Sequence, residues 1–202
     1  MQQKVTHHEI KMTHELVIAV FCSDRTTRLQ TGLFSGVVFH RTQLYGAECY
    51  RNEIHVFDYS QSALIQTRTV KLRFSAIGGT LRLRAGNNRL TCSNTAHHEI
   101  LVYSLSGKFL QAFSRQGSGD AGRLGSPIIC DVDIEGSVLI ADFDNNRLQV
   151  MSEQGEFRVL DLQPQVSQPE SAVIFSGDLY VTSYKECTVY KYSCTGIQGM
   201  LH

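Results

Sequence analysis

The chain has 202 residues, and its nineteen Lys and Arg residues balance nineteen Asp and Glu, so the formal net charge is zero. This neutrality argues against a function dominated by contacts to nucleic-acid phosphates, and we expect no DNA partner. No apolar run approaches the roughly 20 residues that a helix needs to cross a bilayer, so we also expect no membrane partner. The hydrophobic content of 42% is normal for a folded globular protein.

The six cysteines form no Cys-x-x-Cys pair, and most lie in apolar runs such as Pro127–Cys130. This pattern favours buried thiols in a reducing compartment, and hence a cytoplasmic protein. His7, His8 and His14 have no cysteine close by, so their spacing does not favour a metal site, and we expect neither metal nor cofactor. The cysteines are Cys22, Cys49, Cys92, Cys130, Cys187 and Cys194.

The charges are distributed unevenly along the chain. Residues 25–115 carry twelve Lys and Arg against four Asp and Glu, a balance of +8. Residues 116–186 carry four against twelve, a balance of −8. Such a division can give two regions of one molecule opposite potentials, although runs of charge commonly serve solubility alone.

The N-terminal residues 1–32 read as a divergent segment or as part of a repeat, because Glu15–Phe21 is rich in residues that favour strands. The first clear repeat follows. Its second strand is expected at Leu44–Glu48 and its third at Ile54–Phe57, with Arg51–Asn52 in the turn between them.

The second repeat starts from a turn at Asn87–Asn88 and continues with a strand at Leu90–Asn94. His97–His98 then occupies the next turn, where we interpret the two histidines as turn residues and not as a catalytic pair. A strand at Ile100–Tyr103 and a turn leading into a last strand at Ser106–Phe109 complete the unit.

The third repeat is the clearest. Strands are expected at Ile128–Val132, Val138–Asp142, Arg147–Met151 and Glu156–Leu160. Turn-forming residues separate them at Glu135–Gly136, Asn145–Asn146 and Gln154–Gly155. Four short strands with turn signals every 8 to 12 residues describe one antiparallel meander of about 40 residues.

The fourth repeat has a strand at Gly177–Ser183, another at Val189–Tyr192 and a turn at Thr195–Gly196. In all four repeats the second strand ends on a side chain that can form hydrogen bonds. We expect these side chains to bond backbone groups at the corner, because a binding site rarely needs one copy in each repeat. They are Glu48, Asn94, Asp142 and Ser183.

The stretch Val138–Val150, followed by Gly155–Phe157, resembles the NHL repeat. That motif consists of a hydrophobic strand, an Ala-Asp corner, an Asn/His-Arg turn and an amphipathic third strand. The second repeat resembles it with Ser93–Asn94 in place of Ala-Asp, whereas Glu53 and Thr188 stand where the motif has arginine. The resemblance covers roughly residues 33–198.

The repeats and the resemblance together predict an all-β fold, a β-propeller built from four-stranded antiparallel blades of the NHL type. We expect four to five blades in this chain, with an incomplete six-bladed propeller left open because NHL propellers typically close with six. Residues 1–32 would form the divergent segment and residues 33–202 the repeats.

The candidate binding residues lie in the loops between second and third strands, which open onto one face of a propeller. Phe143 and Tyr184 occupy the same repeat position, and Tyr50 lies one residue off it. Aromatic rings beside basic groups suit protein recognition or base stacking, although such rings also commonly pack between blades. The predicted partner-binding residues are Tyr50, Arg51, His97, His98, Phe143, Tyr184 and Lys185.

The resemblance implies a recognition module like the C-terminal propeller of tripartite-motif proteins, which carry RING, B-box and coiled-coil segments ahead of it. We therefore expect a non-catalytic module that binds a protein partner or substrate. The first alternative is single-stranded RNA binding through the basic half, at Arg68, Lys71, Arg73, Arg82 and Arg84. The second is a metal-dependent propeller enzyme of the lactonase or lyase type, with Glu48, Asp142 and Asp144 as candidate ligands.

Overall fold

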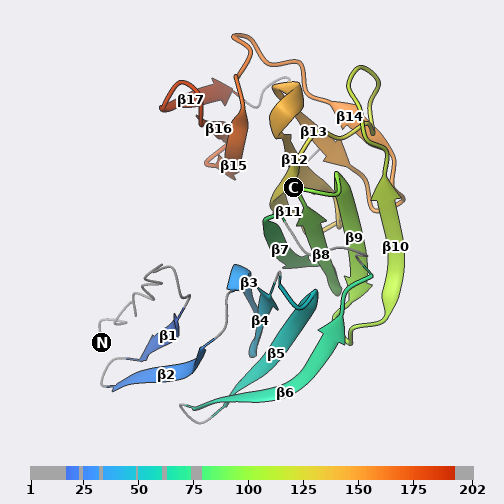
Figure 1. The fold of residues 1–202 in the computed structure, drawn as a ribbon. Coiled ribbons are helices and arrows are strands. Elements are labelled where there is room, and N and C mark those ends of the chain that lie inside the picture. The colour runs from blue at the N-terminus through green and yellow to red at the C-terminus, as the bar shows by residue number, and fades with distance from the viewer. Residues whose placement is uncertain are drawn as a thin grey trace. The chain divides into compact units, whose positions relative to one another are not determined.

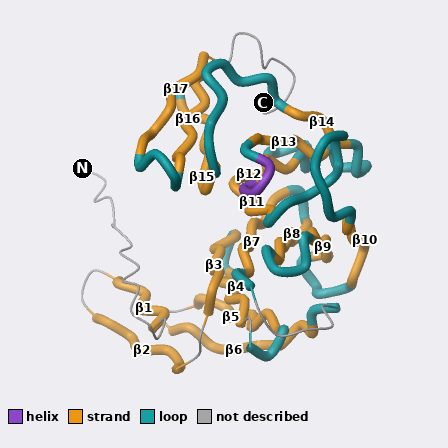
Figure 2. Tube along the Cα trace, turned by 45° about the horizontal axis from the view of Figure 1, so that its top comes forward, coloured by secondary structure: helices purple, strands orange, loops and turns teal. Residues whose placement is uncertain are grey.

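The computed structural model describes residues 17–22, 25–31, 34–48, 50–60, 63–73 and 79–193, and for 17–22, 25–31, 59–60 and 63–64 it describes the backbone alone. The described chain is built from strands, with one short 3-10 turn (Figure 2). His7, His8, His14, Cys49, Cys194 and the turn at Thr195–Gly196 lie outside the described residues.

The chain divides into two compact units, Met1–Ile77 and Gly78–His202, which we describe separately. In the first unit, β1 (Val17–Cys22) pairs with β2 (Arg25–Thr31) in a two-stranded sheet. A four-stranded antiparallel sheet follows, called blade 34–71 below. Its strands are β3 (Phe34–His40), β4 (Gln43–Glu48), β5 (Glu53–Ser60) and β6 (Ala63–Lys71).

The second unit contains three further antiparallel sheets (Figure 1). Blade 81–114 consists of β7 (Leu81–Gly86), β8 (Arg89–Asn94), β9 (Glu99–Ser104) and β10 (Phe109–Ser114). Blade 127–159 consists of β11 (Pro127–Val132), β12 (Val138–Asp142), β13 (Arg147–Met151) and β14 (Phe157–Val159), with the 3-10 turn η1 (Phe143–Asn145) after β12. Blade 169–193 has three strands among the described residues, β15 (Pro169–Phe175), β16 (Asp178–Ser183) and β17 (Thr188–Ser193).

Tight turns close these meanders at the positions that the sequence predicted. Gly155 adopts a φ of 88°, and its N–H donates to the carbonyl of Ser152 at 2.9 Å, which reverses the chain between β13 and β14. Gly136 has a φ of 92° and closes the β11–β12 turn against the carbonyl of Asp133 at 3.2 Å. Glycine adopts this left-handed conformation without the strain that a Cβ would add.

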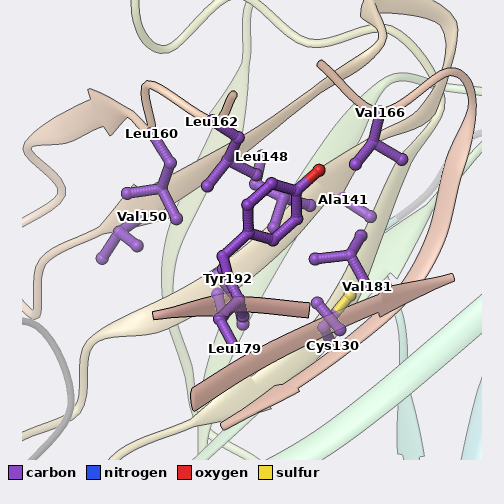
Figure 3. Packing of buried hydrophobic residues seen from close by; sticks show 12 residues of the cluster. Cys130, Ala141, Leu148, Val150, Leu160, Leu162, Val166, Leu179, Val181 and Tyr192 are labelled. Carbon is purple, nitrogen blue, oxygen red and sulfur yellow. The ribbon is translucent and has the colours of Figure 1, made fainter. Parts of the chain in front are cut away.

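Hydrophobic side chains fill the space between neighbouring blades of the second unit. Ile100 and Val102 of β9 pack with Ile129, Ile140 and Met151, which join blade 81–114 to blade 127–159. A second cluster joins blade 127–159 to blade 169–193 (Figure 3). It includes Leu139, Ala141, Leu148, Leu179, Val181 and Tyr192. Neighbouring blades of the second unit therefore bury apolar faces against each other, as in a propeller.

Four successive antiparallel meanders, with buried interblade cores between the three of the second unit, confirm the predicted fold class, an all-β propeller of about four blades. The predicted second and third strands of the four repeats correspond to β4 and β5, β8 and β9, β12 and β13, and β16 and β17, except that Gly177 lies in the turn before β16. In the part of the chain that the structure describes, no helix is long and apolar enough to cross a bilayer.

Candidate functional site

The corner between β12 and β13 is built around the buried carboxylate of Asp142. One of its oxygens accepts the N–H of Gly125 at 2.6 Å. The other accepts Arg147 Nε and Gln149 Nε2, each at 2.8 Å, and Asn145 Nδ2 at 2.8 Å. A carboxylate offers about four acceptor positions, so Asp142 uses its full capacity inside the protein. This supports a structural role for Asp142 over the metal-ligand role of the enzyme alternative.

Two other corners use the same position to bond the backbone, as predicted. Asn94 accepts the N–H of Ala96 at 3.0 Å through its side-chain oxygen. The Ser183 hydroxyl accepts the N–H of Glu186 at 3.1 Å. Both side chains are buried, so these bonds satisfy groups that water does not reach. The corner at Glu48 is different and is described below.

One residue ahead of the third strand of every blade has a left-handed backbone. In two blades the side chain of this residue bonds the backbone ahead of the next blade. His98 Nδ1 accepts the N–H of Ser126 at 2.8 Å, and Asn146 Oδ1 accepts the N–H of Gln168 at 2.8 Å. His98 therefore acts as a turn residue, as the sequence indicated. The residues and their φ angles are Asn52 (51°), His98 (50°), Asn146 (55°) and Cys187 (51°).

A pocket of about 280 Å³ opens in the second unit where the inner strands β7, β11 and β15 meet the loops that follow β8, β12 and β16. All three blades of the unit contribute to its wall. Among its lining residues are Arg82, Ile128, Phe143, Asp144, Glu170 and Tyr184. This pocket is the candidate binding site because three of the predicted residues, Arg82, Phe143 and Tyr184, meet in it.

Phe143 and Tyr184 form an aromatic pair across two adjacent blades. Their ring centroids are 5.8 Å apart, and the ring planes are tilted by 56°. Phe143 is half-buried, whereas 63% of the Tyr184 surface remains exposed. The pair therefore packs together and still presents an aromatic surface to a ligand.

The charges around the pocket have both signs. Arg82 lies on the inner strand β7, whereas the exposed Asp144 and Glu170 belong to the other two blades of the unit. The Ser126 hydroxyl donates to the Asp144 carboxylate and holds it at the rim. Two carboxylates next to two aromatic rings form an environment that favours a cation over a phosphate.

The remaining predicted partner residues lie outside this pocket. In the first unit, Tyr50 is exposed and Arg51 Nε lies 3.4 Å from Glu48 Oε1. Lys185 is exposed in the loop after β16. It contributes to lowering the pKa of Glu186, for which the main cause is the hydrogen bond from Tyr190. His97 is half-buried in the turn beside His98.

The basic residues of the RNA alternative have varied surroundings. Lys71 pairs with Glu53, and Arg68 bonds the Tyr45 hydroxyl, whose pKa is raised chiefly by burial. Arg82 and Arg84 alternate with the buried Leu81 and Leu83 along β7, and the sequence alternation alone predicts that both arginines point to solvent. However, Arg84 does not point to solvent as the alternation suggested: its Nε donates to the Cys130 carbonyl of β11 at 2.7 Å. Arg73 is exposed after β6.

Two cysteines of the second unit are buried thiols, as the sequence indicated. Burial raises the pKa of Cys130 to about 11, and it also raises that of Cys92. Such thiols stay protonated and unreactive at neutral pH. Cys187 is exposed.

A cluster that the sequence did not predict lies at the corner of blade 34–71. His55 Nε2 lies 2.9 Å from Glu48 Oε2 and 3.5 Å from Glu53 Oε2. The Glu48-to-His55 spacing of seven residues matches that of Asp142 to Gln149, and Glu53 replaces the arginine of the repeat. This spacing is the signal by which the set could have been found. Also unpredicted are the pocket residues Ile128 and Glu170 on the inner strands.

No protein-family model matches the chain, and no curated protein is similar to it in sequence. Solved structures of β-propeller-like proteins are similar to it in fold. A catalytically inactive virginiamycin B lyase from Staphylococcus aureus, crystallised with quinupristin, has 12% identity and a TM-score of 0.56, over 78% of this chain and 54% of that one. An auxiliary nutrient binding protein from Bacteroides ovatus has 15% identity and a TM-score of 0.66, over 83% and 50%.

A 6-phosphogluconolactonase-like protein from Bacteroides uniformis has 11% identity and a TM-score of 0.66, over 91% of this chain and 62% of that one. The chain spans about half the length of the lyase and of the nutrient binding protein. At these identities the similarity concerns the fold, and it supports the propeller architecture.

Proposed function

We propose that this chain is a non-catalytic, propeller-type recognition module that binds a protein partner, and that the pocket beside Phe143 and Tyr184 receives an Arg or Lys side chain of that partner. The observation that carries this proposal is the aromatic pair. Two rings from adjacent blades lie 5.8 Å apart at a pocket of about 280 Å³, and one of them is mostly exposed. Exposed tyrosines beside a pocket are typical anchors of protein interfaces.

Charge supports a cationic ligand group. Asp144 and Glu170 both line the pocket, and most of its wall belongs to residues 116–186, which carry a balance of −8. A guanidinium or ammonium group can approach an aromatic face and a carboxylate at the same time, which is worth about 0.5–2 kcal/mol for the ring contact alone. Arg82 also lines the pocket and adds a positive charge to its wall.

The bonds of the pocket favour binding over catalysis. His98 Nδ1 accepts the backbone N–H of Ser126, while the Ser126 hydroxyl donates to Asp144. These three residues therefore fix the loop ahead of β11 and do not form a nucleophile–base pair, in which the imidazole would accept the hydroxyl proton. The two carboxylates also oppose the binding of RNA phosphates at this pocket.

A protein-recognition propeller is also the substrate-selecting end of ubiquitin ligases of the tripartite-motif type. We extend the proposal to that setting, in which this module would choose the substrate and a catalytic part outside this sequence would modify it. The resemblance of Val138–Val150 to the NHL repeat supports the extension.

The test is a titration of the ¹⁵N-labelled full chain with acetyl-arginine amide, followed by NMR. We expect shifts of the backbone signals of Phe143, Asp144, Glu170 and Tyr184, and weaker shifts with acetyl-citrulline amide, which has a similar shape without the charge. Tyr184→Ala should weaken the binding about 5- to 30-fold, which corresponds to roughly 1–2 kcal/mol. Phe175→Ala is the matched control. Phe175 is about as exposed as Tyr184, and it lies at the end of β15 away from the pocket residue Glu170.

Equal shifts with the arginine and citrulline ligands would contradict a cation site. A pull-down with wild-type, Tyr184→Ala and Phe175→Ala baits then tests the protein partner. Proteins that survive ribonuclease and are lost only with Tyr184→Ala would support the proposal. Binding of a mixed single-stranded RNA pool that depends on Tyr184, with no such proteins, would replace it by the RNA alternative.

A further inference from the structure

The corner of blade 34–71 brings two carboxylates and one imidazole together inside the sheet. Glu48 of β4 and Glu53 of β5 are direct partners in the antiparallel register, and His55 lies two residues further along β5 on the same face. Their side chains are only 10%, 12% and 6% exposed. Two acidic side chains directly opposite each other destabilise a sheet unless a positive charge compensates them.

Blade 127–159 shows how the same three positions are balanced elsewhere in this chain. There Asp142, Arg147 and Gln149 occupy the places of Glu48, Glu53 and His55. Arg147 Nε lies 2.8 Å from the Asp142 carboxylate and supplies the positive charge that the corner needs. In blade 34–71 this arginine is replaced by a second acid. The corner of blade 34–71 therefore has a second carboxylate at the position where blade 127–159 has a cation.

The donor atoms have the separations that a small divalent metal requires. Ligands 2.0–2.2 Å from a tetrahedral zinc ion are about 3.3–3.6 Å apart. His55 Nε2 lies 2.9 Å from Glu48 Oε2 and 3.5 Å from Glu53 Oε2, and one ligand atom of each residue lies within 4.8 Å of the other two. Because the Glu48 and Glu53 ligand atoms lie within 4.8 Å of each other, side-chain adjustments of about an ångström would place all three at bonding distance from one ion.

The second ring nitrogen of His55 already has a partner on the next strand. His55 Nδ1 lies 3.0 Å from the side-chain amide of Gln66 on β6, and that amide lies 3.1 Å from the Thr69 hydroxyl. If Nε2 binds a metal, Nδ1 carries the proton and donates it to the amide oxygen after a rotation of the Gln66 amide. Such a bond orients a histidine ligand and fixes its tautomer.

Two exposed cations cover the outer side of the cluster. Lys71 pairs with Glu53, and Arg51 Nε lies 3.4 Å from Glu48 Oε1. Their side chains are 77% and 66% exposed, so both can return to water when an ion takes over the neutralisation of the carboxylates. An ion would enter the cluster past these two side chains.

We propose that Glu48, Glu53 and His55 form a binding site for a divalent first-row transition metal such as Zn²⁺, with a fourth position left for water. Imidazole with carboxylates favours such ions over Mg²⁺, which prefers oxygen ligands alone. The site lies within one blade and is independent of the Phe143–Tyr184 pocket.

The experiment is a calorimetric titration of the full chain with Zn²⁺ and with Mg²⁺, in a Cys187→Ala background because that thiol is exposed. We expect Zn²⁺ to bind at micromolar concentration or tighter and Mg²⁺ to bind at least 100-fold more weakly. His55→Gln and Glu53→Arg should each weaken Zn²⁺ binding by at least 100-fold. Gln66→Ala should weaken it about 10-fold, as removal of an orienting partner does.

The double variant Glu53→Arg/His55→Gln controls for folding, because it copies Arg147 and Gln149 into this corner. Its circular dichroism should match the wild type while its Zn²⁺ binding is lost. His97→Gln is the control for other histidines and should leave the affinity unchanged. Zn²⁺ binding that is equally strong in wild type and His55→Gln, or absent from the wild type at millimolar Zn²⁺, would overturn the proposal.

Discussion

The left-handed residue ahead of each third strand holds the same backbone conformation in four blades with three different side chains. Asn tolerates this conformation because its side chain bonds locally, but Cys187 pays a steric penalty at its φ of 51°. We therefore predict that Cys187→Gly raises the free energy of unfolding by about 1 kcal/mol. Urea denaturation followed by circular dichroism measures the change.

The control for this prediction is Cys187→Ala, which removes the thiol and keeps the Cβ. It should leave the midpoint of denaturation within experimental error of the wild type. A similar gain from alanine would mean that the thiol, and not the backbone conformation, is unfavourable.

The Asp142 carboxylate is the most heavily bonded side chain among the corner residues. Its removal leaves the guanidinium of Arg147, whose side chain is largely buried, without its charged partner. We predict that Asp142→Ala lowers the free energy of unfolding by about 3–5 kcal/mol, as is usual when one member of a buried ion pair is lost. Denaturation with guanidinium chloride provides the measurement.

Asp178→Ala is the comparison for Asp142→Ala. Asp178 pairs with Lys191 at 2.8 Å, but that lysine is exposed, so the loss should stay below about 1 kcal/mol. Equal losses for the two variants would contradict the role of the buried corner.

At the scale of strands and turns, the sequence predicted most of the second and third strands of the blades. The reason is local: β12 is a short apolar run, β13 is a short amphipathic one, and a turn with Asn146 separates them, so each of these signals acts within a few residues. The inner strand β15 and the pairing of β1 with β2 were not predicted, because the recognised part of the fourth repeat began at Gly177 and residues 1–32 matched no repeat clearly.

The candidate site was only partly predictable. Phe143 and Tyr184 were identified because they share one repeat position, and the packing of neighbouring blades then brings them together. Glu170 and Ile128 were missed because the sequence pattern of an inner strand predicts which residues share a face, but not which of them line a pocket. Arg84 shows the same limit, since its bond to the Cys130 carbonyl depends on the next blade.

The core between blades 81–114 and 127–159 should be sensitive to cavities. Ile140 is fully buried at its centre, so we predict that Ile140→Ala lowers the free energy of unfolding by about 2–5 kcal/mol. Val159→Ala on the outer strand β14 should change it by less than 1 kcal/mol, because Val159 is exposed. Urea titration of both variants compares them. A loss below half a kcal/mol for Ile140→Ala would show that this strand is not packed.

For the whole molecule, the buried thiols predict a loss of stability at high pH. The pKa of Cys130 rises from 9.0 to about 11 on folding, so the unfolded chain releases this proton first. The stabilisation is complete below pH 9, falls between about 9 and 11, and levels off above that. Cys92 acts in the same direction. We expect the urea midpoint to fall over this range.

Cys92→Ala/Cys130→Ala separates the thiols from other groups that ionise at high pH. Tyr45 and Tyr192 also have raised pKa values through burial, so part of the fall should remain. The double variant should nevertheless show a shallower decline than the wild type between pH 9 and 10. An unchanged slope would assign the whole effect to the tyrosines.

The connection between β10 and β11 is exposed at many positions, but side chains of β13 in the next blade hold it by hydrogen bonds. Arg147 donates to the carbonyls of Gly119, Asp120 and Arg123, and Gln149 accepts the N–H of Gly122 at 2.8 Å. Exposed loops are the usual sites of proteolytic nicking. A protease must draw several residues of its target into an extended shape, which these bonds oppose. Trypsin should therefore not cleave after Arg123 in the native protein, but it should cleave there once Arg147 is replaced by Ala. One side chain in β13 would then set the lifetime of a peptide bond in another part of the chain.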